Sequence, residues 1–251
     1  MLFLRSAALL LAMCISLTSF SQGREFLKPD YDAIKKATHD KGSAYYYPSL
    51  FERYKSNDTT LTPDQYKYVY YGYFFNKADD TASLEKLSEE TNEIRTILSA
   101  ENPGEADLKR ALQLSLKHVE HAPFDLRKLN YIYRINMNLG DTVNGRKYFE
   151  RVRGLIRTIL NSGDGRTDET GYHILDVSHE YFVLSVLGYE STGQKRTPLP
   201  CDYLTLKSNE DNLEGIYFDV TQIFAGYNEM FKDVGKDFLE TGSQKKNRKK
   251  R

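Results

Sequence analysis

The hydrophobic residues of this 251-residue chain follow two different spacings, and the change between them falls at Asn161. Before Asn161, apolar residues recur every three or four positions, as they do along one face of an α-helix. After Asn161, apolar and polar residues alternate in short runs separated by turn residues, which is typical of β-strands. Two of these runs, over 201–206 and 215–220, are joined by a polar loop and predict an antiparallel hairpin, and a final helix is expected over 223–238. The sequence therefore predicts a mainly α fold, with a helical region over 22–160 and a small α+β module over 161–240.

The helical region contains clear signals for where helices begin and end. Thr62, Pro63 and Gln65 predict a capping box with proline in the first turn, and Leu61 and Tyr66 are spaced to pack as a hydrophobic staple. Helices further along the chain pair into units of roughly 34 residues, which fits a tetratricopeptide-like stack of hairpins. Such stacks offer grooves to peptides or partner proteins and rarely carry catalytic groups.

Aromatic residues are concentrated in the helix that follows this capping box, between Tyr66 and Phe74. Aromatic rings in such a belt could stack on sugars. Large aromatic side chains more often form a core that keeps its hydroxyl groups at the rim, and we favour the core interpretation.

The first 21 residues have the features of a secretory signal peptide. Arg5 precedes an apolar run from Ala7 to Leu17, and small residues favour cleavage after Ser21. The run is shorter than the 20 or so residues that span a bilayer. A lipidated Cys14 is the alternative, although the preceding Met13 is larger than a lipoprotein signal favours. We expect an exported protein that is periplasmic or associated with the cell envelope.

Charge is distributed unevenly along the chain. Residues 241–251 include six of the 35 basic side chains and are predicted to form a disordered tail. Without this tail and Arg5, the 35 acidic residues outnumber the basic residues by seven. An acidic body argues against nucleic-acid binding, which depends on neutralising phosphates. The tail alone could make weak contact with an anionic surface.

Several separated motifs resemble one known family. Their order along the chain is Tyr45–Leu50, Tyr70–Phe74, Ser162–Ile174, Glu180–Tyr181, Cys201–Tyr203 and Ile216–Asp219. Together they are similar to domain-of-unknown-function family 4919, over about residues 30–231. The resemblance implies an exported bacterial protein that is partly tetratricopeptide-like, and it implies no activity and no catalytic residue.

The turn Gly163-Asp164-Gly165 is the first candidate for chemistry. It lacks the Lys-Ser or Lys-Thr pair of a Walker loop, and it lacks the alternating ligands and closing Glu of an EF-hand. Asp164, Asp168 and Glu169 could hold one metal ion loosely. We favour a structural turn, because glycine and aspartate supply left-handed backbone and a side-chain hydrogen bond.

The histidines do not form a recognisable ligand set. His118 and His121 are three residues apart near a predicted helix end, where histidines commonly interact with the helix dipole and terminal carbonyl groups. His173 and His179 flank a predicted strand over 172–177. Alternation along that strand predicts that the His173 side chain is exposed, on the sheet face opposite to that of Tyr172 and Ile174.

Two further groups of residues could support hydrolysis. Asp176 and Glu180 lie close in sequence to His173 and His179, so a general-base pair could form there. Cys201, followed by Asp202, could act as a thiol nucleophile with a distant histidine. After signal cleavage Cys201 is the only cysteine, and a buried, inert thiol is the more common role.

The sequence thus favours a noncatalytic exported module that binds a protein or peptide. It assigns no catalytic, cofactor-binding or metal-binding residue, and it predicts no transmembrane span. Two alternatives remain open. One is an envelope hydrolase with its site near Gly163-Asp164-Gly165, and the other is a structural protein associated with the envelope through its tail.

Export makes a direct prediction about the mature N-terminus. N-terminal sequencing of the protein from its native host should begin at Gln22, because cleavage after Ser21 satisfies the small-residue rule. A chain that begins at a diacylated Cys14 would instead identify a lipoprotein.

Overall fold

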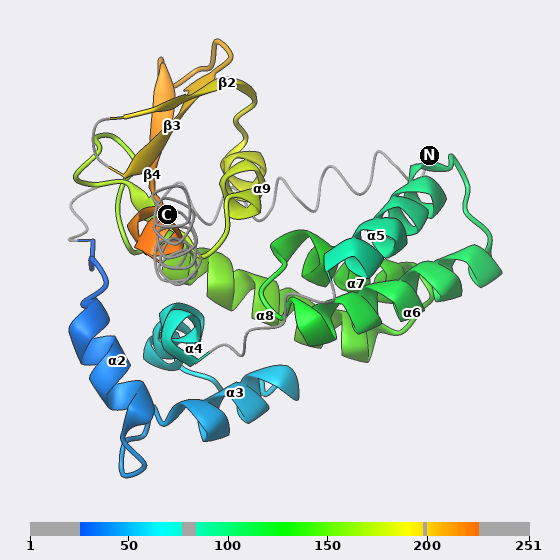
Figure 1. Ribbon diagram of the computed structural model, residues 1–251. Coiled ribbons are helices and arrows are strands. Elements are labelled where there is room, and N and C mark those ends of the chain that lie inside the picture. Colours follow the sequence, from blue (N-terminus) through cyan, green and yellow to red (C-terminus); the bar gives the residue numbers. More distant parts are fainter. Residues whose placement is uncertain (1–25, 77–83, 198–199, 226–251) are drawn as a thin grey trace, which may run out of the picture.

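The computed structural model describes residues 26–76, 84–197 and 200–225, and the predicted signal peptide and basic tail lie outside these ranges. Helices dominate the first part of the described chain, and a small sheet with one helix follows (Figure 1). This arrangement confirms the mainly α fold with a small α+β part. None of the described helices combines the length and the apolar composition needed to cross a membrane. The helices before the sheet are α2 (Tyr31–His39), α3 (Tyr47–Lys55), α4 (Pro63–Asn76), α5 (Leu84–Ser99), α6 (Glu105–His121), α7 (Leu126–Asn138) and α8 (Thr142–Leu160).

Local capping explains where several of these helices begin. At the start of α4, the Gln65 backbone N–H donates to Thr62 Oγ1 over 3.2 Å, and the Thr62 backbone N–H donates to Gln65 Oε1 over 3.0 Å. The predicted capping box is therefore confirmed. Asp125 and Asp141 cap α7 and α8 in the same way, each accepting a hydrogen bond from a backbone N–H in the first turn.

Consecutive helices pack against one another from α5 through α8, as expected of a stack of helical hairpins. The long helix α8 also packs against α4, and α4 in turn contacts α2 and α3. Figure 1 shows α4 nearly end-on while α8 runs across the view, so the two helices cross. Helix α8 is therefore shared between the α5–α7 stack and the N-terminal helices.

A buried arginine holds α8 against its neighbours. Arg151 is 3% exposed, and its Nη2 donates to the Pro123 carbonyl over 2.9 Å. Its guanidinium lies 4.0 Å from the centre of the Tyr54 ring, and the Tyr54 hydroxyl donates to the same carbonyl over 2.8 Å. This cation is stabilised by a carbonyl and an aromatic face, which links α3, α8 and the turn between α6 and α7.

The sheet has the strand order β1-β4-β3-β2. Along the chain, α9 (Ser178–Leu187) lies between β1 and β2. The predicted hairpin is confirmed, because β3 (Cys201–Leu206) pairs antiparallel with β4 (Gly215–Asp219). Strand β1 (Tyr172–His173) pairs parallel with β4. The polar edge strand β2 (Ser191–Arg196) was not expected, since its sequence lacks the apolar alternation of a buried strand.

The predicted strand over 172–177 is wrong in length, because β1 comprises only two residues. Asp176 ends the extended stretch by accepting a hydrogen bond from the Ser178 backbone N–H over 2.8 Å, which starts α9. The expected final helix over 223–238 lies mostly outside the described residues.

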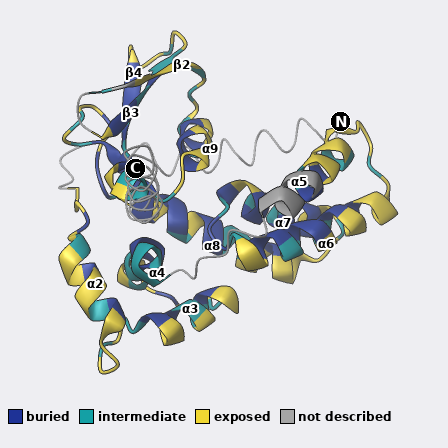
Figure 2. Cartoon of the chain, in the orientation of Figure 1, coloured by how far each residue is buried: buried dark blue, intermediate teal, exposed yellow. Residues whose placement is uncertain are grey.

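One cluster of buried side chains extends from the helices into the sheet (Figure 2). Within α4, Tyr66, Tyr70 and Tyr71 are buried, so the core interpretation of the aromatic belt is confirmed. The expectation that the hydroxyl groups lie at the rim is wrong for Tyr70 and Tyr71. Both hydroxyl groups are buried, and each is hydrogen-bonded to the segment that leads into α9.

The Tyr70 hydroxyl belongs to a buried chain of hydrogen bonds. The Leu175 backbone N–H donates to the Tyr70 oxygen over 3.2 Å, and the hydroxyl lies 2.7 Å from His179 Nδ1. His179 Nε2 lies 2.9 Å from the Phe124 carbonyl oxygen. Because a carbonyl only accepts, Nε2 carries the ring proton and Nδ1 accepts from Tyr70. Burial lowers the pKa of His179, which keeps this neutral form.

We expect Tyr70→Phe to destabilise the fold by about 2 kcal/mol or more. The change keeps the ring and removes both hydrogen bonds of the hydroxyl, which leaves His179 Nδ1 and the Leu175 N–H buried without that partner. Urea unfolding measures the loss. The matched control is Tyr68→Phe on the same helix, where the side chain is half-buried and the effect should stay within about 0.5 kcal/mol. Equal effects of the two changes would contradict the role given to Tyr70.

Candidate functional site

The glycine turn uses its aspartate for its own backbone. Asp164 Oδ1 accepts hydrogen bonds from the Arg166 backbone N–H over 3.0 Å and from Thr170 Oγ1 over 2.6 Å. Gly165 has a φ of 67°, in the left-handed region that favours glycine. These contacts support a structural turn at Gly163-Asp164-Gly165. Among the described residues, no group of three His, Cys, Asp or Glu side chains is placed to hold a metal ion.

His173 is buried, so the expectation of an exposed side chain is wrong. Helix α8 packs against β1, and tyrosine side chains from α2 and α4 reach His173. His173 Nδ1 lies 3.1 Å from the Tyr31 hydroxyl and 3.7 Å from Asp219 Oδ2. The Tyr71 hydroxyl donates to the His173 carbonyl over 3.2 Å. Burial lowers the pKa of His173, and the nearby Asp219 charge opposes this effect.

His118 connects two consecutive helices. Its Nε2 lies 2.9 Å from Oδ2 of Asp125, the residue that caps α7. Burial acts to raise the pKa of Asp125, but the hydrogen bond with His118 and the charge of Lys128 outweigh it and hold that pKa at about 2. His121, which is exposed, ends α6 one turn later. These contacts support a structural role for His118 at the turn between α6 and α7.

Cys201 is a buried thiol on β3. Its Sγ donates to the Asp168 carbonyl over 3.1 Å, and burial raises its pKa to about 12, so it is protonated at neutral pH. The strand register places Asp219 opposite both Cys201 and His173. Cys201 and His173 are therefore two strands apart, roughly 10 Å, which is too far for a nucleophile–base hydrogen bond.

A buried pair of carboxyl groups was not recognised from the sequence. Glu180 on α9 and Asp202 on β3 are 0% and 4% exposed. Asp202 Oδ2 accepts from Gln194 Nε2 over 2.8 Å, whereas Asp202 Oδ1 and both Glu180 oxygens lack a conventional donor among the described residues. Burial raises the pKa of Glu180 to about 8, and the adjacent Asp202 adds to this effect. A proton on Glu180 removes the repulsion between two buried carboxylates and supplies a donor to Asp202.

An open groove lies where α4 meets α8. Two of its lining residues are in close contact: Gly154 allows the Tyr66 ring to approach α8, since a Cβ atom at residue 154 would clash with that ring. The groove has a volume of about 190 Å3. Its lining residues are Leu27, Thr59, Leu61, Pro63, Asp64, Tyr66, Lys67, Tyr71, Glu150, Arg153, Gly154, Arg157, Thr158 and Asn161.

The charges of this groove come from both helices. Arg153 forms an ion pair with Glu150, one turn earlier on α8. Lys67 on α4 and Arg157 on α8 form no ion pair or side-chain hydrogen bond with any other described residue. No sequence pattern indicates this site, because its two helices are about 90 positions apart in the chain. Asp164, Asp168, His173 and His179 do not line it.

The family model for a domain of unknown function (DUF4919) matches residues 32–229 of the chain. The chain belongs to this family. The match confirms the resemblance in the separated motifs, and it covers the described helices except Tyr31, the sheet, and the groove lining of this DUF4919 protein except Leu27. No curated protein and no solved structure is significantly similar to it.

The buried carboxyl pair of this DUF4919 protein should make its stability fall as pH rises. The pKa of Glu180 is about 8 in the fold and about 4.5 when exposed, so the folded state binds the proton more tightly. The contribution of Glu180 to the free energy of unfolding is fully present below pH 4.5 and is lost as pH rises toward 8. The slope of this loss is up to about 1.4 kcal/mol per pH unit. Asp176 contributes a further repulsive charge.

Glu180→Gln should remove this slope, because a neutral amide does not titrate. The free energy of unfolding in urea, measured from pH 5 to 9, checks this. Glu190→Gln is the control, since Glu190 is exposed and pairs with Lys207 on the surface. Parallel pH profiles for wild type and Glu180→Gln would show that Glu180 does not hold the proton.

Proposed function

We propose that this protein is an exported, noncatalytic interaction module whose α4–α8 groove holds part of a partner protein or peptide. The observation that carries this proposal is the pair of cations, Lys67 and Arg157, that face the groove without an ionic partner among the described residues. The two residues come from different helices, so the fold brings two positive charges to one concave site, and such a site attracts a negatively charged group of a ligand.

The other titratable groups support a noncatalytic role. His173, His179 and Cys201 are buried and bonded to neighbouring parts of the fold, and Asp164 is used by its own turn. A general base or a nucleophile must reach its substrate, and these groups do not line the groove. Helical hairpin stacks commonly use their surfaces to bind peptides.

Export is supported by the sequence before residue 26. Arg5, the apolar run and the small residues before Gln22 favour cleavage and release from the cytoplasm. We place the protein in the periplasm or in association with the envelope, where its groove would meet a partner protein or peptide.

Blocking the groove tests the proposal. The probe is a set of peptides selected from a phage-displayed random library on the mature chain, residues 22–251. Asp64→Cys places a thiol on an exposed lining position, and a bulky maleimide attached there should abolish binding of the selected peptides. The native Cys201 is 3% exposed and should react slowly.

Asp107→Cys, labelled with the same reagent, is the matched control, because Asp107 is exposed on α6 outside the groove. We expect this label to leave peptide binding unchanged. Peptides that bind equally well to both labelled proteins would place the interaction elsewhere, and a library that yields no binder would contradict peptide recognition.

A further inference from the structure

The groove has features that specify the chemistry of what it holds. Lys67 is half-buried and Arg157 is exposed, and they come from different helices that meet at the groove. Within the same lining, Arg153 is paired with Glu150, whereas Lys67 and Arg157 have no acidic partner among the described residues. Exposed cations outside the groove, such as Arg127 on α7, also lack an ion pair among the described residues, so what distinguishes Lys67 and Arg157 is that both line one concave site.

We propose that Lys67 and Arg157 together hold one carboxylate side chain, an Asp or a Glu, of the bound peptide. This inference rests on the proposed function of the groove and names the chemical group that it selects. A guanidinium can donate two parallel hydrogen bonds to a carboxylate, and an ammonium adds a compact third donor.

The size of the groove favours a side chain over a larger ligand. Pockets for whole cofactors or drug-sized molecules occupy about 300–1,000 Å3. The volume here is about 190 Å3, which accommodates one or two side chains. A peptide would therefore insert an anchoring residue while its backbone stays outside.

The net charge of the groove lining favours a ligand group that carries a single negative charge. Three cations, Lys67, Arg153 and Arg157, face two acidic residues, Asp64 and Glu150, so the lining carries a net charge of about +1. A carboxylate balances that charge. A phosphate dianion would exceed it and would be repelled by the two acidic side chains.

The uncharged part of the lining predicts what accompanies the carboxylate. Apolar and aromatic side chains from three segments also line the groove, and they are Leu27, Leu61, Pro63, Tyr66 and Tyr71. Residues next to the acidic anchor would gain free energy by burying apolar surface there. We therefore expect an acidic residue adjacent to an apolar one.

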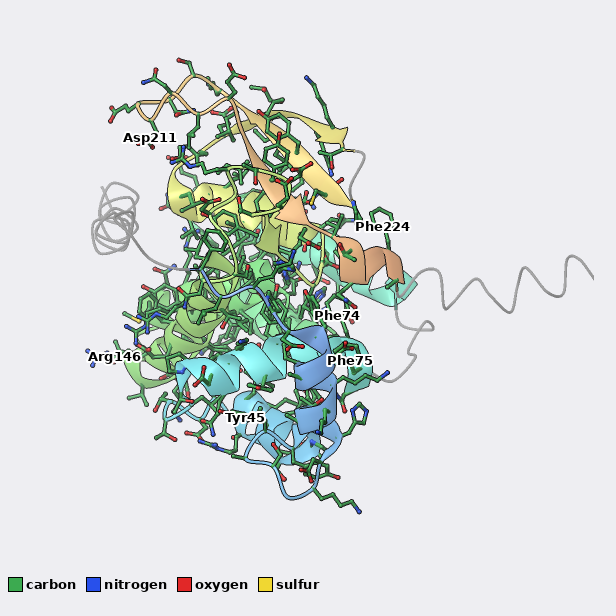
Figure 3. The ribbon with its side chains drawn as sticks, turned by 90° about the vertical axis from the view of Figure 1, so that its left-hand side faces the viewer. Tyr45, Phe74, Phe75, Arg146, Asp211 and Phe224 are labelled. Atoms are coloured by element: carbon green, nitrogen blue, oxygen red, sulfur yellow. The ribbon has the colours of Figure 1, made fainter. Side chains whose placement is uncertain are left out.

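Figure 3 shows the molecule turned by 90° from the view of Figure 1, with the blue and cyan helices α2, α3 and α4 in the lower part and the sheet above them. Arg146, labelled in that view, belongs to the same helix as Arg157 but lies three turns earlier and does not line the groove. Recognition of the carboxylate is thus assigned to Arg157 and Lys67 and not to basic charge along α8 in general.

Peptides selected on the mature wild-type chain provide the test. We expect Asp or Glu beside an apolar residue to be enriched. A synthetic copy of the best peptide should bind at least about tenfold more tightly than its Asp→Asn or Glu→Gln counterpart, because a charge-assisted hydrogen bond is lost in the amide. The preference should weaken as salt concentration rises.

Charge reversal identifies the residues responsible. Lys67→Glu and Arg157→Glu should each abolish the preference for the acidic peptide, and selection on Arg157→Glu should enrich Lys or Arg in place of Asp or Glu. Arg127→Glu on α7 is the matched control, because Arg127 is exposed outside the groove and should not alter the selection. Circular dichroism melting of each variant establishes that it is folded.

The outcomes separate this inference from the proposed function. If a label at Asp64 blocks the selected peptides but their amide counterparts bind equally well, the groove binds peptides and the carboxylate clamp is wrong. A preference that survives both charge reversals overturns the assignment to Lys67 and Arg157. If no peptide is enriched, or the label at Asp64 has no effect, both proposals fail.

Discussion

The structure depends on a buried histidine that stays neutral. His179 accepts a hydrogen bond from Tyr70 and donates one to the Phe124 carbonyl, so α9 is held against α4 and against the turn between α6 and α7. A proton on Nδ1 would remove the acceptor of the Tyr70 O–H and leave that hydroxyl proton without a partner in a buried site. Because these contacts fix α9, they also fix the strands that follow it on the helical body.

The same packing buries most of the candidate reactive groups and leaves the groove as the candidate binding site. The residues that looked reactive in the sequence are buried or bonded within the fold: His173 contacts Tyr31, Cys201 contacts the Asp168 carbonyl, and Asp164 closes its own turn. Burial raises the pKa of Glu180 and so favours a proton on it beside Asp202. The groove where α4 meets α8, by contrast, is lined by exposed and half-buried charged side chains.

Features that depend on neighbouring residues were predicted correctly. The capping box of α4, the antiparallel pairing of β3 with β4 and the change from helices to strands after α8 all follow from signals within a few positions. The burial of His173 was predicted incorrectly, because it depends on α2 and α4, more than 90 residues away. Strand β2 was missed because pairing with β3, and not apolar alternation, makes it a strand.

By itself, the sequence determined the class of fold, the family motifs and the positions where helices begin. Those properties arise from backbone preferences and side-chain spacing, which act locally. Only the tertiary structure decided which polar groups meet: Tyr70 with His179, Glu180 with Asp202, and Lys67 near Arg157. Each of these pairs joins residues from different elements. Burial and packing of several segments together set which of these side chains carry a proton and which have no ionic partner.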